Sequence, residues 1–375
     1  MKKTIVFLHP HFLKPAGASK VVLEFASRLQ KQSNFKIKII TIATNPEVIS
    51  PYPNLDIINL GGPTTGSIYF WLTFPLFFKK LKTTLNQIPD KIIFAHSLAI
   101  YWSYFYYLSN QKIPNIIYFH DLGFPYSDSS LETNSLSIFY RIIAKITNQL
   151  FQYLNHKIIK SNIKLMANSQ CSANYIYQKY HRHPDTIITP GIDIQQFSPT
   201  LNKENYFYTV GRLEKIKQTD KIIEAIKNFN NPKYKLKIIG EGIEENKLKK
   251  LAIKLNISNQ IEFLGKLSSH QVASIASKAL IGIFNCPNES FGLSILESLT
   301  SGTPVITVNQ GGGTNLVINN FNGYLSNGTS TFIAKLIPNA IKNNKILSLN
   351  ATKKAQNYDW NIKTKELSQF LSGLN

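Results

Sequence analysis

Two glutamates, Glu289 and Glu297, are separated by seven residues in a stretch where a polar loop leads into a helical pattern. Glu289 ends the loop, and Glu297 lies in the first turns of a helix predicted over 293–300. The N–H groups that open a helix have no partner within it, so with the positive end of the helix dipole they can receive an anion. The residues at that opening are Phe291, Gly292 and Leu293. A carboxylate beside them can accept hydrogen bonds from sugar hydroxyls.

Two cations, Arg212 and Lys217, follow a strand predicted over 206–210. The guanidinium of Arg212 is a planar fork suited to phosphate oxygens, and the Lys217 ammonium is a point charge. No Asp-x-Asp motif and no His/Cys ligand set is present, so we expect no metal.

In their order along the chain, these motifs resemble the retaining glycosyltransferases of family 4 (glycosyl transferases group 1), which have the GT-B fold. Glu289 to Glu297 is similar to the E-x7-E signature, and Gly211-Arg212 with Lys217 resembles the G-R-L-x-x-x-K segment. The resemblance covers essentially the whole chain. It also rests on the loop 15–21, Phe119-His120-Asp121, Ala167-Asn168-Ser169, Thr189 to Asp193, Phe197, Pro199, Gly311-Gly312, Asn322-Gly323 and Trp360.

The resemblance implies transfer of a hexose from a nucleotide-diphosphate sugar with retention of anomeric configuration. Arg212 and Lys217 would replace a metal ion at the diphosphate, so the co-substrate would be the only cofactor. Glu289 would contact hydroxyls of the donor sugar, and Glu297 would hold the nucleotide ribose. His120 would touch the donor sugar, with its backbone carbonyl as one candidate contact. The implied catalytic set is therefore His120, Glu289, Arg212 and Lys217.

The remaining donor-binding residues that the resemblance implies are Gly17, Gly211, Phe291, Gly292, Leu293 and Glu297. This chain departs from the family pattern at several loop positions without losing a proposed catalytic group. Those positions are Ala16, Ser19-Lys20, Gln218, Asn285-Cys286 and Asn315. His96, at the end of a predicted strand, is a weaker candidate for the same site as His120. UDP-glucose and GDP-mannose types both remain open as donors, with a slight lean towards GDP-mannose.

The elements that must position these residues alternate short strands rich in Ile, Val and Phe with amphipathic helices. This alternation occurs twice and predicts an α/β chain with two doubly wound, Rossmann-like domains facing across a cleft. We predict an N-terminal acceptor-binding domain over 1–195 and a nucleotide-sugar-binding domain over 196–355. A last helix in 356–375 would cross back to the first domain. Ligands of such sheets bind at the carboxyl ends of the strands.

The composition limits the classes of partner. The chain has 375 residues, 43 % of them hydrophobic, and a net charge of +21 spread over both halves. Its two cysteines suit a reducing cytosol, and no segment reads as a membrane span or a signal peptide. The basic helical pattern over 138–164, with aromatic clusters at 69–78 and 101–107, suits an anionic membrane surface. The alternative is that the aromatics form core and the lysines a solvated face.

We therefore predict a cytoplasmic enzyme, with peripheral attachment to the inner membrane face as a hypothesis. Its acceptor would be a glycan or a lipid-linked molecule in cell-envelope or polysaccharide synthesis. One alternative is an inverting GT-B transferase or a nucleotide-sugar epimerase. Another is a basic membrane- or nucleic-acid-binding protein, although no RNA-recognition, zinc or helix-turn-helix signature is present and we predict no nucleic-acid partner. A catalytically inactive sugar-binding relative is disfavoured by the intact motifs.

Overall fold

The computed structural model describes residues 2–14, 16–62, 74–120, 138–200 and 202–374; the side chains of Phe74 and of 138–148 lie outside this description. The chain divides into two compact units. Unit 1 comprises Met1–Thr189 with Lys363–Asn375, and unit 2 comprises Pro190–Ile362. Each unit has its own parallel sheet and its own core.

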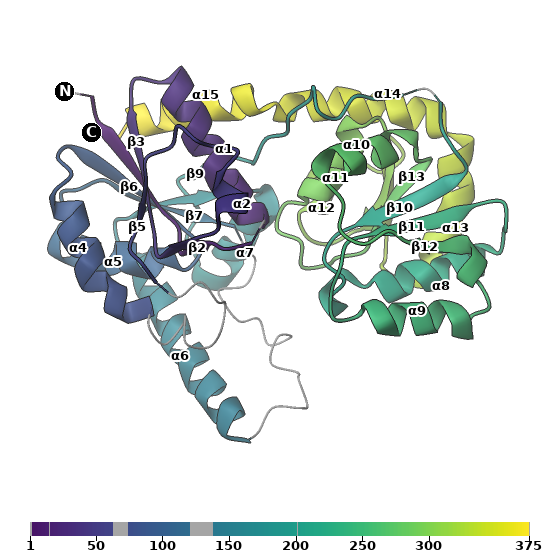
Figure 1. Cartoon of the computed structure of the whole chain (residues 1–375), viewed down its shortest axis with the longest axis horizontal. Coiled ribbons are helices and arrows are strands. Elements are labelled where there is room, and N and C mark those ends of the chain that lie inside the picture. The colour runs from purple at the N-terminus through teal and green to yellow at the C-terminus, as the bar shows by residue number, and fades with distance from the viewer. Residues whose placement is uncertain (1, 15, 63–73, 121–137, 201, 375) are drawn as a thin grey trace. The chain divides into compact units, whose positions relative to one another are not determined.

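Unit 1 is built on a parallel sheet of seven strands in the order β5-β3-β1-β6-β7-β8-β9 (Figure 1). Every residue of β1 is buried, as expected for a parallel strand covered on both faces. The strands are β1 (Thr4–Leu8), β3 (Lys36–Thr41), β5 (Ile57–Asn59), β6 (Lys91–His96), β7 (Asn115–Phe119), β8 (Lys164–Ala167) and β9 (Thr186–Ile187). A separate pair joins β2 (His11–Phe12) to β4 (Ala43–Thr44).

Helices lie on both faces of this sheet. In Figure 1, α1 lies on the opposite side of the strands from α4, α5 and α6. The last three helices share one hydrophobic cluster with the strands and with α7. The helices are α1 (Gly17–Gln32), α2 (Pro46–Ile49), η1 (Phe74–Phe77), α4 (Phe78–Asn86), α5 (Ala99–Ser109), α6 (Ile138–Lys160) and α7 (Gln170–Tyr180).

The aromatic cluster at 101–107 is mostly core. Four aromatic residues of α5 are buried, namely Tyr101, Trp102, Tyr104 and Tyr106. Two of their hydroxyls donate to asparagine side chains, that of Tyr101 to Asn155 and that of Tyr106 to Asn86. For these four residues a membrane-facing role is wrong, because their rings are buried in the core of unit 1. Most of the cluster predicted at 69–78 lies outside the described residues.

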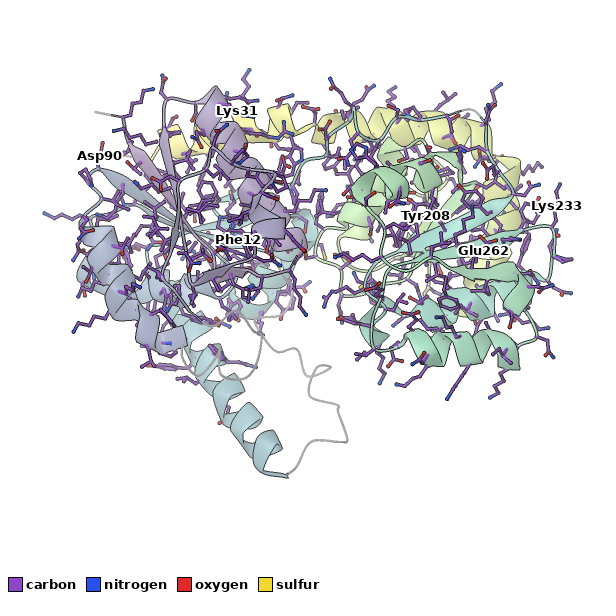
Figure 2. All side chains as sticks on the ribbon, in the orientation of Figure 1. Phe12, Lys31, Asp90, Tyr208, Lys233 and Glu262 are labelled. Atoms are coloured by element: carbon purple, nitrogen blue, oxygen red, sulfur yellow. The ribbon has the colours of Figure 1, made fainter. Side chains whose placement is uncertain are left out.

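Unit 2 is built on a parallel sheet of six strands in the order β12-β11-β10-β13-β14-β15. These are β10 (Tyr206–Val210), β11 (Lys235–Ile239), β12 (Ile261–Phe263), β13 (Ile281–Phe284), β14 (Val305–Val308) and β15 (Gly323–Ser326). In Figure 2, Tyr208 of β10 lies among the side chains inside unit 2, whereas Lys233 lies at its edge.

Helices cover the second sheet in two groups. α8, α9 and α13 contribute to one hydrophobic cluster, α10 and α11 contribute to the other, and α14 contributes to both. The helices are η3 (Lys215–Lys217), α8 (Thr219–Phe229), α9 (Glu245–Lys254), η4 (Ser258–Gln260), α10 (Ser269–Lys278), α11 (Leu293–Thr300), α12 (Gly313–Leu316), α13 (Ser330–Lys342), α14 (Asn344–Ala355) and η5 (Gln356–Tyr358).

The two sheets have the same winding. In each sheet, the second and third long strands along the chain lie to one side of the first strand. The next strand along the chain lies on the other side of the first. The reversal falls between β1 and β6 in unit 1 and between β10 and β13 in unit 2. Ligands of doubly wound sheets bind in the crevice at this reversal, beyond the carboxyl ends of the strands. The prediction of two Rossmann-like domains is confirmed.

The last helix, α15 (Trp360–Ser372), begins in unit 2 and ends in unit 1. At its start, Trp360 packs on Gly191, where a Cβ would lie 2.7 Å from the indole ring. Packing within unit 2 therefore requires a glycine at position 191. Just beyond the other end of the helix, the Lys3 ammonium donates to the carbonyl of Leu374 over 2.8 Å.

Candidate active site

A hollow in unit 2 lies at the reversal between β10 and β13. It is bounded by the loops that follow these two strands and by the first turn of α11. The lining residues are Thr209, Val210, Gly211, Arg212, Leu213, Lys217, Thr219, Ile239, Phe284, Asn285, Cys286, Glu289, Ser294, Ile295 and Thr307. Four of the predicted site residues therefore meet here: Gly211, Arg212, Lys217 and Glu289.

An ion pair joins two walls of the hollow. The Lys217 ammonium lies 2.7 Å from a carboxylate oxygen of Glu289, and both side chains are less than one-third exposed. Burial by itself lowers the pKa of the Lys217 ammonium. The negative charge of Glu289, its hydrogen bond with the ammonium and the neighbouring Cys286 together outweigh burial, so the pKa of Lys217 is raised above its ordinary value. The lysine is therefore a permanent cation at neutral pH.

Arg212 has a different environment. Its side chain is 75 % exposed, and one guanidinium nitrogen is hydrogen-bonded to the carboxylate of Glu214. An exposed pair of this kind is weak because water screens it. The guanidinium can therefore leave Glu214 for a phosphate at little cost in free energy.

Glycines allow the loop carrying Glu289 to pack against the backbone of the next loop. A Cβ on Gly312 would lie 2.3 Å from the carbonyl oxygen of Ser290, and one on Gly311 would lie 2.7 Å from that of Glu289. The Gly312 N–H donates to this same Glu289 carbonyl over 2.6 Å. The position of the Glu289 backbone therefore depends on the glycine pair that the sequence singled out.

The predicted helix opening is confirmed, with α11 starting at Leu293 and Gly292 as its N-cap. Gly292 has φ +96°, in the region that only glycine adopts without strain. Ser294 and Ile295, in the first turn, line the hollow, whereas Phe291 is buried in the core. The N–H groups of that turn have no partner within the helix, so the end of α11 can bind an anion in the hollow.

Glu297 lies on α11 but is not among the residues that line the hollow. Its side chain is half-buried and lies close to Tyr208 on β10. Burial raises the pKa of the Tyr208 phenol, and the charge of Glu297 raises it further. Glu297 is thus not one of the predicted residues that meet in the hollow.

Unit 1 gathers histidines at its own strand reversal. His9 follows β1, His96 ends β6 and His120 follows β7, and all three are buried. His96 Nδ1 and His120 Nε2 are 2.8 Å apart, and the rings are stacked with centroids separated by 5.1 Å. The His120 carbonyl accepts a hydrogen bond from the Asn168 side chain over 2.9 Å. Asn168 belongs to the Ala-Asn-Ser motif at the end of β8. It thus holds the backbone carbonyl of His120, which is a candidate contact for the donor sugar.

Burial determines the charge state of these histidines. It lowers the pKa of His120 to about 3. It also lowers the pKa of His9 and of His96 well below the ordinary value, and neighbouring histidines lower both further. All three rings are therefore neutral at physiological pH, and each carries a single ring proton.

Gly17 is the first residue of α1, next to the same edge of the sheet. Two residues later, the Ser19 hydroxyl lies 3.1 Å from His9 Nε2, and both groups are buried. Gly17 and His120 belong to unit 1, and the other predicted site residues belong to unit 2.

Sequence reasoning missed several residues of these two sites. They are His9, Ser19, Thr209, Thr219, Asn285, Cys286, Ser294, Ile295 and Thr307. His96 was predicted only as a weaker candidate than His120, although the two rings are paired. A signal existed for His9 and His96, since each stands at the carboxyl end of an apolar strand. The pairing of His96 with His120 had no sequence signal, because it depends on β6 and β7 being neighbours.

The chain resembles known proteins in sequence and in fold. Residues 192–358 match the family model described as "Glycosyl transferases group 1". Over these residues, which make up most of unit 2, the chain is similar to glycosyl transferases group 1. A D-inositol 3-phosphate glycosyltransferase of Corynebacterium kroppenstedtii is 23 % identical over 79 % of the chain and 71 % of that protein. The protein of the same name from Corynebacterium efficiens is 22 % identical, over 95 % of the chain and 90 % of its own length. Some others of that name match over about half of their length.

Among solved structures, the chain is similar to Anabaena HepE in complex with UDP and glucose. The TM-score is 0.78, with 19 % identity and coverage of 99 % of each chain. The likeness establishes the shared GT-B fold with its two Rossmann-like domains. Within the described residues, no three His, Cys, Asp or Glu side chains are grouped so as to hold a metal. Nor is any helix there long and apolar enough to cross a bilayer.

Proposed function

We propose that this chain is a group 1 glycosyltransferase that moves a hexose from a nucleotide-diphosphate sugar to its acceptor with retention of configuration and without a metal. The observation that carries the proposal is the ion pair of Lys217 and Glu289 at the strand reversal of unit 2. It places a fixed cation and a hydroxyl-binding carboxylate side by side, where doubly wound sheets bind ligands. A sugar diphosphate needs both at neighbouring positions.

The diphosphate binds between Lys217, Arg212 and the first turn of α11. Lys217 supplies a charge that is already fixed, so little reorganisation is needed as the leaving phosphate becomes more negative. Arg212 leaves Glu214 and adds its two-pronged hydrogen bonds. Gly211 and Gly292 shape the backbone on either side of the phosphates, with Phe291 and Leu293 flanking the helix opening.

Glu289 and His120 bind the transferred sugar, and Gly17 allows the first loop to approach the diphosphate. Glu297 binds the ribose, a role supported only by its place in the motif, since it does not line the hollow with Glu289. The departing phosphate oxygen accepts the proton of the acceptor hydroxyl as that hydroxyl attacks the same face of the sugar. Retention then requires no covalent glycosyl-enzyme, unlike the two-carboxylate route of retaining glycosidases.

The experiment that tests this function is proton NMR of the product formed from UDP-glucose. UDP-glucose is the first donor to try because the fold is shared with HepE, whose crystal structure holds UDP and glucose. An α-linked product from the α-configured donor supports retention. A β-linked product would favour the inverting alternative, and a C4- or C2-epimerised nucleotide sugar with no transfer would favour an epimerase.

We further propose that the acceptor is lipid-linked and that unit 1 meets an anionic membrane through α4, α5 and α6. These helices contain seven Lys or Arg residues and no Asp or Glu. The helices pack together, since Phe78 contacts Phe105 and Tyr101 contacts Phe151. The large apolar side chains exposed on or beside them are Leu76, Phe105, Leu108, Leu150 and Tyr153.

Charge and exposed apolar surface together favour a lipid surface over nucleic acid. Lys79, Lys82 and Lys157 are exposed beside these apolar groups, and the Lys157 ammonium lies 5.5 Å from the ring centre of Tyr153. Aliphatic side chains such as Leu150 gain by entering a bilayer, whereas nucleic-acid sites offer aromatic stacking surfaces. Arg141 and Lys145, also part of the predicted basic helix, have side chains outside the described residues.

Vesicle binding at low salt tests this attachment. We expect binding to phosphatidylcholine vesicles that contain phosphatidylglycerol and none to phosphatidylcholine alone. Replacing Lys79, Lys82 and Lys157 by Gln should weaken binding on the order of a hundredfold, at about 1 kcal/mol per lysine. The matched control replaces Lys247, Lys250 and Lys254 of α9. Equal losses in both triple variants, or a stronger preference for a single-stranded oligonucleotide, would contradict the proposal.

A further inference from the structure

The paired rings of His96 and His120 share a single hydrogen bond. Nδ1 of His96 and Nε2 of His120 are 2.8 Å apart, and the two residues are 0 % and 7 % exposed. A neutral imidazole carries one N–H and one bare nitrogen. The bond therefore needs a proton on one of these two nitrogens and none on the other. The tautomer of either ring consequently fixes the tautomer of its partner.

No carboxylate in the described residues pairs with either ring. His96 is enclosed by Phe7, Phe94 and Tyr118, and His120 lies against Tyr118. Burial is the cause that lowers the pKa of His120, and for His96 the neighbouring His120 and His9 add to the effect of burial. Both rings are thus neutral, and hydrogen bonding alone decides where their protons lie.

The unused nitrogen of His96 indicates which tautomer is present. His96 Nε2 is buried and has no hydrogen-bond partner within the described part of the chain. Among buried backbone groups, an N–H without an acceptor is rarer than a carbonyl without a donor, and we expect the same order for ring nitrogens. Nε2 of His96 is therefore the bare nitrogen, and its proton lies on Nδ1. That proton is donated to His120 Nε2, which leaves the proton of His120 on Nδ1.

We propose that His96 is a positioning residue that holds His120 in the Nδ1–H tautomer, so that His120 presents a hydrogen-bond donor to a hydroxyl oxygen of the transferred sugar. This inference rests on the proposed function, in which His120 touches the sugar. Asn168 complements it by holding the backbone carbonyl of His120. One neighbour thus anchors the main chain of the contact residue, and the other sets the chemistry of its ring.

Nitrogen-15 NMR of the histidine rings tests the tautomer without any ligand. In the wild type we expect His120 to show a protonated Nδ1 and a bare Nε2 at pH 7, and His96 to show the same assignment. Loss of individual signals in His96→Asn and His120→Asn assigns the spectrum. A protonated Nε2 on His120 would overturn the proposal, whatever the enzyme does with nucleotide sugars.

Variants of His96 separate positioning from packing. The Asn amide of His96→Asn can donate an N–H near the position of Nδ1, whereas His96→Leu fills the space and donates nothing. With UDP-glucose as donor, we expect His96→Leu to lower kcat about tenfold, the effect of one hydrogen bond, and His96→Asn to restore most of it. His270→Leu, an exposed histidine on α10, is the control.

Three outcomes distinguish the possibilities. If Asn and Leu at position 96 reduce kcat equally while His120 keeps its Nδ1 proton in both, the positioning role is wrong. If His96→Leu fails to fold, His96→Asn and the ring spectrum of the wild type still decide the question. If the wild type turns over no nucleotide sugar and His120 carries its proton on Nδ1, the tautomer assignment stands and the proposed function fails.

Discussion

The ammonium of Lys217 lies 2.7 Å from the carboxylate of Glu289, across the hollow between the loops that follow β10 and β13. A donor that arrives in this hollow brings a diphosphate that competes for the lysine and hydroxyls that compete for the glutamate. Without a donor the two side chains thus bind each other, and each can exchange this contact for its proposed contact with the donor. The two side chains should contribute to different steps.

Removing the glutamate should damage the reaction more than the fold. We expect Glu289→Ala to lower kcat by about 10²–10³-fold because the sugar hydroxyls lose a charged acceptor in the transition state. Glu289→Gln keeps the shape and should retain more activity than Ala. The free energy of unfolding should change by less than about 1 kcal/mol, since the partly exposed Lys217 can be hydrated. A large loss of Tm with unchanged kcat per folded enzyme would contradict the assignment.

Removing the lysine should affect the leaving diphosphate. Lys217→Met should lower kcat/KM by about 10²–10³-fold, whereas Lys227→Met, an exposed lysine on α8, should have little effect. Because Glu289 helps to raise the pKa of Lys217 above the ordinary 10.5, its charge should persist throughout the neutral and mildly alkaline range. A loss of kcat/KM between pH 8 and 10 that disappears in Lys217→Arg would contradict this.

Gly312 should be irreplaceable because backbone surrounds it. The Cβ of Gly312→Ala would lie 2.3–2.5 Å from the backbone of Ser290 and Phe291, so the loop behind Glu289 must move. We expect about 1–3 kcal/mol of destabilisation and a raised donor KM. Gly373→Ala, whose Cβ meets nothing closer than 3.6 Å, is the control for denaturant unfolding and kinetics. Equal behaviour of the two variants would be inconsistent with this packing.

Acid should destabilise the protein through its buried histidines. Below pH 6.5 the unfolded chain takes up protons on these rings, whereas folded His120 stays neutral down to about pH 3. The folded state therefore binds fewer protons, and its stability falls as the pH is lowered through this range. Each such ring contributes up to about 1.4 kcal/mol per pH unit. Denaturant titrations at several pH values between 7 and 5 give the free energy of unfolding at each pH. This free energy should fall less steeply with decreasing pH for His120→Asn than for the wild type. An identical pH dependence would contradict the assignment.

Local sequence patterns predicted most of the fold. The strand Tyr206–Val210 and the helix Leu293–Thr300 were predicted with the bounds that the structure has. Buried parallel strands are continuous apolar runs, and helix ends carry Gly signals, so both can be read locally. β15 was missed because the strand Gly323–Ser326 starts with glycine and holds few β-branched residues.

The site was predictable only as far as the motifs reached. Arg212, Lys217 and Glu289 line one hollow as the motifs implied, whereas Glu297 does not line it. The pairing of His96 with His120 and the support of His120 by Asn168 involve residues 24 and 48 positions apart. Such contacts depend on which strands become neighbours, and no local pattern encodes that.

The central claim is that the hollow of Lys217 and Glu289 binds and activates a nucleotide-diphosphate sugar. The most direct measurement is nucleotide release from a panel of UDP-, GDP- and ADP-sugars, with and without EDTA, by the wild type and by Glu289→Ala. The account predicts turnover of one donor that resists EDTA and is lost in the variant. Turnover that EDTA abolishes, or equal turnover by Glu289→Ala, would contradict it.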